Sequence, residues 1–262
     1  MVDSLASKGN IVAIIPAAGR GSRLSPFPFP KELFPIGYQD VVINDCTEKR
    51  PKVVSQYLIE NMIAAGATHI LIILGEGKSD IMSYYGDGKR FGTNIIYLYQ
   101  EELRGMPSAI DLARPWINGD TVLFGMPDTI IEPKNAFDIL RKYHEEQNSV
   151  LTLGLFPTDN PSKFGMVETD ADSNVTYTID KPKDTTLQNM WGCACWSKEF
   201  TQILQQFLSL KEYQGKEIVL GDVFDYALEL NLKVKGLVFE KGKYMDIGTT
   251  SELDQALKQF HL

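Results

Sequence analysis

The order of apolar segments along the first 156 residues restricts the fold more than any other feature of this sequence. Short apolar runs, which are typical of buried strands, alternate there with segments of helical periodicity. The expected strands are 11–15, 69–74, 94–99, 121–124 and 150–156, and the expected helices are 53–65, 79–85, 106–116 and 133–147. Because strands that alternate with helices form right-handed βαβ units, the sequence predicts an α/β fold with a mostly parallel sheet.

The pattern changes after residue 156. Residues 166–169 and 175–180 flank a polar loop and predict a β-hairpin, and 191–196 and 234–239 predict two further strands. Helical periodicity follows at 198–208, 217–230 and 251–260. We therefore expect the second part of the chain to form a subdomain over the carboxyl ends of the parallel strands, with ligands in the crevice between the two parts.

A glycine-rich turn follows the first expected strand and is a candidate phosphate site. Gly19 and Gly21 allow backbone N–H groups to approach an anion closely, and Arg23 and Lys31 supply the cations that phosphoryl oxygens prefer. Leu24 stands where a dinucleotide fingerprint has its third glycine, and no Gly-Lys-Ser/Thr follows the turn, which disfavours a P-loop. The alternative is a tight turn that needs glycine for its geometry alone.

The charge balance limits the classes of partner. The chain has 262 residues and a formal net charge of −8, which argues against nucleic acid and anionic membranes because both reward basic surfaces. Anionic substrates would therefore need a local basic cluster, for which Arg20, Arg23, Lys31 and Lys181 are the candidates.

The cysteine and histidine contents point to an unmodified chain in a reducing compartment. Three cysteines are too few for a disulfide framework, and Cys193 and Cys195 flank Ala194 so that both thiols face one side of a strand. The three histidines are far apart, which disfavours a histidine-based zinc site. Residues 1–10 lack an apolar signal core and no run is long enough to span a membrane, so we expect a cytoplasmic location.

Two polar residues follow expected strands at the edge where ligands should bind. Gln100 carries an amide that donates and accepts at once, which matches the carbonyl–NH–carbonyl edge of uracil or thymine. Gly105, close behind it, would let the backbone approach a base; the alternative is a helix N-cap. Asp128 follows the strand 121–124, where a metal-bound triphosphate would need a carboxylate.

Residues 16–24 (PAAGRGSRL) and 30–36 (PKELFPI) together resemble the signature of sugar-1-phosphate nucleotidyltransferases. That family includes the glucose-1-phosphate thymidylyltransferases and the UTP–glucose-1-phosphate uridylyltransferases. Its pattern is Gly-x-Gly-Thr-Arg, a loop and Pro-Lys; this chain has Ser22 in place of Thr, which keeps the hydroxyl, and a slightly shorter loop before Lys31. Extra residues at 38–50 contain a short expected edge strand at 41–43, in a surface loop or at the mouth of the site.

The resemblance implies a Rossmann-like, GT-A-type mixed sheet in one nucleotidyltransferase domain over residues 1–262. Residues 10–150 would form the nucleotide-binding part, and residues 151–262 the sugar-phosphate-binding part. The implied reaction joins dTTP or UTP to a sugar-1-phosphate and releases pyrophosphate, by in-line attack at the α-phosphate with Mg²⁺. The partners are then small molecules, and the resemblance implies a homo-oligomer.

The resemblance also assigns roles to residues of this chain. The nucleotide-binding residues would be Ala17, Ala18, Gly19, Gly21, Ser22, Gln100 and Gly105. The sugar-binding residues would be Phe164, Gly165, Asp180, Asn189 and Gly192. Arg23 would steady the β- and γ-phosphates, Lys31 would meet the triphosphate and Lys181 would orient the attacking phosphate. Asp128 and Asp246 would hold Mg²⁺.

Two other functions stay open at this point. Phe164 replaces the family's Tyr and Asp180 its Glu, which leaves room for a cytidylyltransferase that acts on an alditol phosphate or a phosphonate. The same fold also occurs as a regulatory domain that binds nucleotide or sugar phosphate without turnover. The presence of Arg23, Lys31 and both aspartates argues against that second alternative.

Overall fold

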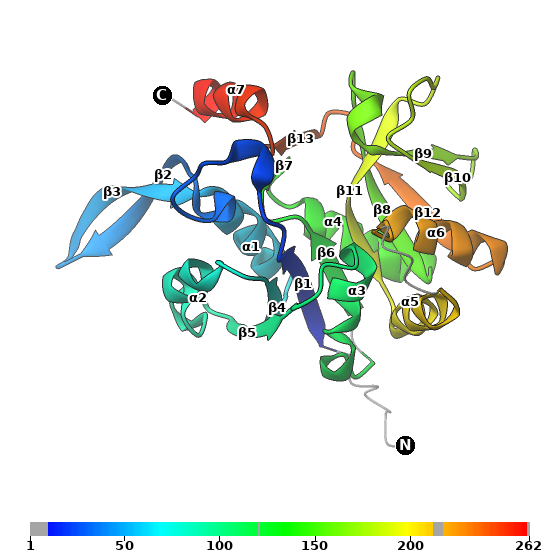
Figure 1. The fold of residues 1–262 in the computed structure, drawn as a ribbon, viewed down its shortest axis with the longest axis horizontal. Coiled ribbons are helices and arrows are strands. Elements are labelled where there is room, and N and C mark those ends of the chain that lie inside the picture. The colour runs from blue at the N-terminus through cyan, green and yellow to red at the C-terminus, as the bar shows by residue number, and fades with distance from the viewer. Residues whose placement is uncertain (1–9, 120, 212–216, 261–262) are drawn as a thin grey trace, which may run out of the picture.

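The computed structural model describes residues 10–119, 121–211 and 217–260 (Figure 1). The first nine residues, on which the expectation of no signal segment rests, lie outside this part of the chain. Among the described helices, none combines the length and the apolar character that crossing a bilayer requires.

Nine strands of the described chain form one mixed sheet (Figure 1). They are β1 (Ile11–Ala17), β4 (His69–Leu74), β5 (Asn94–Tyr99), β6 (Thr121–Gly125), β8 (Leu151–Pro157), β9 (Gly165–Thr169), β10 (Val175–Asp180), β11 (Asn189–Trp196) and β12 (Val234–Val238). Their order is β10-β9-β11-β6-β1-β4-β5, with β8 on β11 and β12 on β8. The strands β6, β1, β4 and β5 are parallel, while β11 runs antiparallel to β6 and β8, so the expected α/β sheet is confirmed.

The two faces of the sheet are covered by different helices. On one face α1 (Val54–Ala64), α2 (Ser79–Tyr85) and α4 (Ala136–Gln147) pack on one apolar cluster. On the other face α3 (Met106–Asp111), α5 (Lys198–Leu210) and α6 (Leu220–Glu229) pack on a second cluster. Strand β1 contributes Ala13 and Ile15 to the first cluster and Val12 and Ile14 to the second, as alternation along a strand requires. Burial on both faces explains its continuous apolar run.

The two cysteines of β11 behave as the sequence predicts. Cys193 and Cys195 are free, fully buried and on the same face of the sheet, while Ala194 faces the opposite cluster.

Two short paired segments were not predicted. Strand β7 (Thr129–Glu132) pairs antiparallel with β13 (Lys243–Asp246) in a separate two-stranded sheet. Each has only four residues, and each pairs with a segment more than 100 positions away, so no local pattern announces them. The expected helix 106–116 is also shorter, because α3 ends at Asp111 and a 3₁₀ turn with Pro115 at its second position follows.

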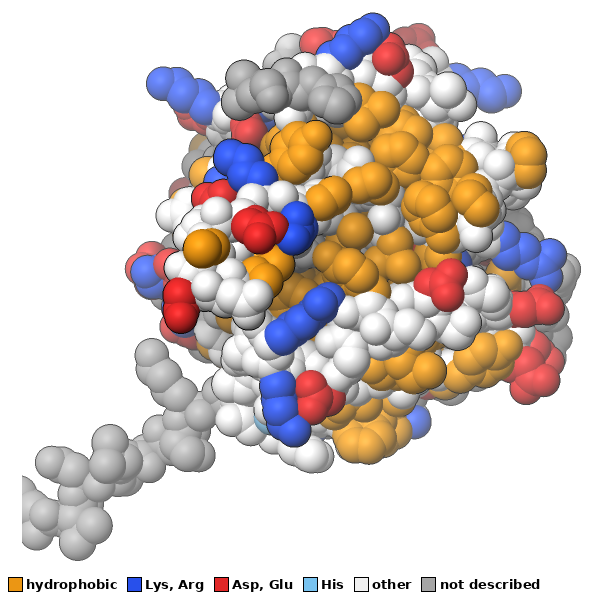
Figure 2. Space-filling view, turned by 90° about the vertical axis from the view of Figure 1, so that its left-hand side faces the viewer, with side chains coloured by type: hydrophobic (Ala, Val, Ile, Leu, Met, Phe, Trp, Pro, Cys, Tyr) orange, Lys and Arg blue, Asp and Glu red, His pale blue; other side chains and the backbone are white. Residues whose placement is uncertain are grey.

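The segment 38–50 is a β-hairpin and not a loop with one short strand. Strands β2 (Pro35–Ile43) and β3 (Cys46–Val53) pair antiparallel, and Asn44 and Asp45 turn with φ of 49° and 62°. Both residue types tolerate this left-handed conformation, so the turn suits the twist of a hairpin. The hairpin projects from the side of the molecule that Figure 2 views, where hydrophobic side chains gather in a broad area. Its own Tyr38 and Val42 are 56% and 71% exposed.

Burial makes His144 of α4 a source of pH-dependent stability. Its Nδ1 lies 2.9 Å from the Thr152 hydroxyl and 3.1 Å from that of Ser149, and its side chain is buried. Burial lowers the pKa of His144 to about 4 from an ordinary value of 6.5, against a smaller opposing effect of the Glu145 charge.

We expect His144 to lower the free energy of unfolding as the pH falls from 6.5 to 4. Between these pH values the unfolded chain binds a proton at His144 and the folded chain does not. The free energy of unfolding therefore falls by about 3 kcal/mol. His144→Gln cannot titrate, so its urea-unfolding free energy should fall less than that of the unsubstituted chain between pH 7 and pH 4. Equal slopes in the two proteins would contradict this assignment.

Candidate active site

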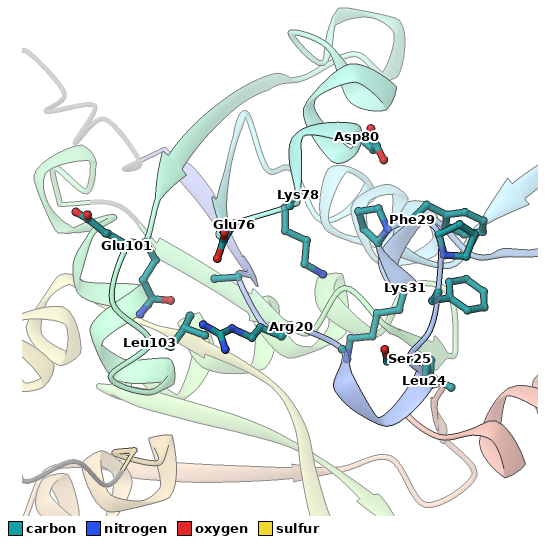
Figure 3. Close-up of a pocket in the computed structure, with 17 residues that line it drawn as sticks. Arg20, Leu24, Ser25, Phe29, Lys31, Glu76, Lys78, Asp80, Glu101 and Leu103 are labelled. Carbon is teal, nitrogen blue, oxygen red and sulfur yellow. The ribbon is translucent and has the colours of Figure 1, made fainter.

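A cavity of about 330 Å³ opens at the carboxyl end of the parallel strands (Figure 3). Three segments line it: the loop 18–31 after β1, the turn 76–80 after β4 and residues 100–103 after β5. Because the carboxyl ends of neighbouring parallel strands lie at one edge of the sheet, loops far apart in sequence converge there.

The glycine-rich turn forms one wall of this cavity. Ala18, Arg20 and Gly21 line it, and Gly21 has a φ of 65° that favours glycine. A Cβ on Gly21 would lie 3.6 Å from the side chain of Lys31, which shows that the lysine stem lies against the turn. Arg20 and Lys31 thus reach the same cavity from two ends of one loop (Figure 3). Of the other turn residues, Ala17 ends β1 and Gly19 and Ser22 are outside the cavity lining.

Lys31 forms an ion pair with Asp128, which lies between β6 and β7. Burial by itself lowers the pKa of Lys31, but the charges of Asp128, Glu32 and Asp246 outweigh it, and the net effect raises the pKa. The lysine therefore stays cationic in the site.

The pairing of β13 with β7 brings Asp246 to Asp128. The N–H of Ile247 donates to the carbonyl of Asp128 over 3.0 Å, and the N–H of Gly248 donates to Asp246 Oδ1 over 2.7 Å. Burial raises the pKa of Asp246 to about 6, and the charges of Asp128 and Glu252 act in the same direction. Two carboxylates that repel one another in this way form a donor set that suits a divalent cation. Among the described residues no group of three or more candidate metal ligands occurs.

Arg23 lies on the Asp246 side and not in the cavity lining. A Cβ on Gly248 would meet both Arg23 Nη2 and Asp246 Oδ1 at 2.9 Å. The charge of Arg23 also contributes to the lowered pKa of Glu252, where it assists Lys163 and Thr249 against burial. Of the two arginines in the predicted basic cluster, Arg20 lines the cavity and Arg23 lies beside Asp246.

Gln100 lies where a base would be expected. It follows β5, its backbone N–H donates to Leu74 over 2.8 Å, and its side chain is 7% exposed. Its Nε2 is buried and finds no hydrogen-bond partner among the described residues, although Gln100 lines the cavity. A buried amide donor without a partner is costly, so a ligand acceptor at this point would satisfy it.

Gly105 is the N-cap of α3 and is absent from the cavity lining. Its φ is 107°, and a Cβ there would lie 2.7 Å from the backbone nitrogen of Ile218. Glycine is therefore required at this position by its positive φ and by the close packing against Ile218.

The residues predicted to bind the sugar gather on β9, β10 and β11, outside the cavity lining. Phe164 packs edge to face on Tyr244 at 5.9 Å between ring centroids, and a Cβ on Gly192 would lie 2.5 Å from the same tyrosine ring. Gly165 similarly leaves space for Trp191. Asn189 begins β11.

Asp180 ends β10 and Lys181 follows it, and both residues are exposed. The Lys181 backbone has a φ of 47°, and its N–H donates to the carbonyl of Phe164 over 2.9 Å. Its ammonium lies 3.9 Å from the Asp180 carboxylate. An accessible ammonium beside this strand end is free to meet an incoming anion.

The sequence reasoning missed Lys78, which lines the cavity from the turn after β4. The signal was present, because Gly75-Glu76-Gly77-Lys78-Ser79 follows a predicted strand and opens a helix. This second glycine-containing turn was not predicted to contribute to the site, because the prediction rested on the turn after the first strand.

The family model described as "Nucleotidyl transferase" matches residues 12–261. Among curated proteins, the low-salt glycan biosynthesis nucleotidyltransferase Agl11 of Haloferax volcanii is 26% identical over 247 residues, which are 93% of this chain and 64% of the relative. A glucose-1-phosphate thymidylyltransferase of Streptomyces antibioticus is 26% identical over 92% of this chain and 64% of its own length. The chain thus spans just under two thirds of these relatives.

Among solved structures, a UDP-glucose pyrophosphorylase complexed with UDP-glucose superposes with a TM-score of 0.78. The match covers 96% of this chain and 98% of the other, at 18% sequence identity. It confirms the fold.

We expect Gly105→Ala to lower the free energy of unfolding by about 3 kcal/mol, because both the positive φ and the contact with Ile218 oppose a side chain. Gly92→Ala is the matched control: its φ is 76°, but a Cβ there has nothing within 4 Å, so the loss should stay near 1 kcal/mol. Urea unfolding of both variants measures the difference. Equal losses would show that the Ile218 contact yields easily.

Proposed function

This chain belongs to the nucleotidyl transferase family, and on that premise we propose that it makes a nucleotide sugar. The proposed reaction joins a pyrimidine nucleoside triphosphate, UTP or dTTP, to a sugar-1-phosphate and releases pyrophosphate. The names of the relatives support this substrate class, because they include a thymidylyltransferase that acts on glucose-1-phosphate and a pyrophosphorylase with bound UDP-glucose.

The observation that carries the pyrimidine assignment is the unpartnered amide of Gln100. Uracil and thymine present a carbonyl–NH–carbonyl edge, so one Gln amide can donate to a carbonyl and accept from the ring N–H. A base seated there satisfies the buried Nε2 and directs the phosphate chain toward Arg20 and Lys31, which line the same cavity. The acceptor's sugar would then lie at the β9–β11 side, against Phe164 and Gly192.

The proposed reaction needs no general base to activate the attacking oxygen. The second pKa of a phosphate monoester is about 6, so the attacking oxygen of a sugar phosphate is already ionised near neutral pH. The protein's task is to align this oxygen with the α-phosphorus and to neutralise charge. In this proposal Lys31 and Arg20 hold the triphosphate, Lys181 orients the acceptor phosphate, and Arg23 approaches the phosphates from the Asp246 side.

A magnesium ion fits the two neighbouring carboxylates. Asp128 and Asp246 would hold it, since Mg²⁺ is usually bound by one or two carboxylates together with substrate phosphates. The bound ion would neutralise charge at the α-phosphate. Such an ion would also offset the repulsion between the two carboxylates, which contributes to the raised pKa of Asp246.

We expect pyrophosphate release when the protein is given Mg²⁺, UTP or dTTP, and a hexose-1-phosphate. The assay crosses four nucleoside triphosphates with a panel of sugar-1-phosphates and alditol phosphates, and EDTA should abolish the signal. Release with CTP and an alditol phosphate alone would indicate a cytidylyltransferase. Silence across the panel, with nucleotide binding detected by calorimetry, would favour a regulatory domain.

We expect Gln100→Leu to lower kcat/KM for the preferred pyrimidine nucleotide by about 10- to 100-fold, because a base edge then faces an apolar side chain. The kcat/KM values for the other nucleotides should fall less, so the enzyme should discriminate less between nucleotides. Gln202→Leu, at an exposed position of α5, is the matched control and should leave preference unchanged. An unaltered preference in Gln100→Leu would remove this residue from the base site.

A further inference from the structure

A buried ion pair, of which Lys78 is one member, borders the cavity. Lys78 Nζ donates to both carboxylate oxygens of Glu32, over 2.9 and 2.7 Å. The two side chains are 5% and 2% exposed. Lys78 comes from the turn after β4, and Figure 3 shows its side chain pointing toward the middle of the cavity.

Glu32 is the residue next to Lys31, and both belong to the 3₁₀ turn η2 (Lys31–Leu33). A single 3₁₀ turn has little stability of its own, so its orientation depends on tertiary contacts. Two such contacts fix Glu32: its carboxylate bonds to Lys78, and its carbonyl accepts from the Ser55 hydroxyl over 2.6 Å. The Ser55 oxygen in turn lies 2.6 Å from the buried hydroxyl of Tyr85.

The Glu32 charge also acts on Lys31. It is one of the charges that raise the pKa of the Lys31 ammonium, together with those of Asp128 and Asp246. Without Lys78, the Glu32 carboxylate would be a buried charge that no cation neutralises. Lys31 is the cation on the adjacent residue.

Stability alone is a weak reason for this pair. A buried ion pair gains little over well-packed apolar side chains, because both charges must leave water. Its location beside the lysine that pairs with Asp128 gives it a more specific use.

We propose that Lys78 is a positioning residue that holds the Glu32 carboxylate and so keeps the Lys31 ammonium directed at Asp128 and the phosphate chain of a bound nucleotide. The inference deepens the proposed function and rests on its nucleotide site. Lys78 then acts through Glu32 and not by contact with the phosphates.

The test is calorimetric binding of UTP and dTTP with Mg²⁺, below the thermal transition of each variant. Lys78→Met leaves Glu32 free to capture Lys31, and nucleotide affinity should fall about 10-fold or more, since small misplacements of a positioned group have large effects. Adding Glu32→Gln removes the competing charge, so the double variant should recover most of that loss. The second substitution repairs the first.

Lys52→Met is the matched control. Lys52 is also a largely buried lysine, and it pairs with Glu60 of α1 outside the cavity lining. Nucleotide affinity should not change. If Lys78→Met does not fold, Lys78→Gln keeps a hydrogen-bond donor to Glu32 without the charge, and the same loss and repair are expected.

Unchanged affinity in the folded single variant would overturn the inference. A double variant as weak as the single one would also overturn it, because Lys78 would then contact the phosphates directly. The loss and repair, found in a chain that releases no pyrophosphate, would support the inference while overturning the proposed reaction. Failure of the unsubstituted chain to bind any of the four nucleotides would overturn both.

Discussion

The ion pair between Lys31 and Asp128 joins the two segments on which the candidate site depends. Lys31 ends the loop after β1, and Asp128 follows β6, the strand beside β1 in the sheet. The pair therefore ties a proline-rich loop, which has little regular structure, to the rigid edge of a parallel sheet. In this pair each charge neutralises the other. An incoming phosphate chain with its metal ion would replace both partners, because the phosphates would pair with Lys31 and the metal ion with Asp128.

The site gathers charged side chains of both signs within an acidic protein. The chain carries a net charge of −8, yet Arg20, Lys31 and Lys78 line one cavity. Glu76, Asp80 and Glu101 line the same cavity, so its wall carries both signs of charge. Asp128 and the half-buried Asp246 lie outside this lining and are linked to it through the ion pair of Asp128 with Lys31. A ligand that carries both phosphates and a metal ion suits such a mixture, because it also presents both signs of charge.

The sequence predicts the fold well where a local pattern carries it. The apolar runs predict β4 and β5 to the residue. The β7–β13 pairing escapes prediction because four-residue strands have no period to read and their partners are distant. For Lys78 the local signal is a glycine-flanked lysine after a predicted strand, whereas its burial and its partner Glu32 come from tertiary packing that no local pattern reports. Of the hairpin at 38–50 only a short strand at 41–43 was predicted, because charged residues interrupt the apolar alternation in the rest of the segment.

The β7–β13 pairing has a consequence for synthesis of the chain. Strands β1, β4, β5 and β6 can assemble soon after they leave the ribosome, because their contacts lie within the first 125 residues. Asp246 reaches Asp128 only after most of the chain has been made and threaded back across the sheet. The segments that line the cavity are thus made well before the second carboxylate. The pair of carboxylates is therefore among the last features of the candidate site to form.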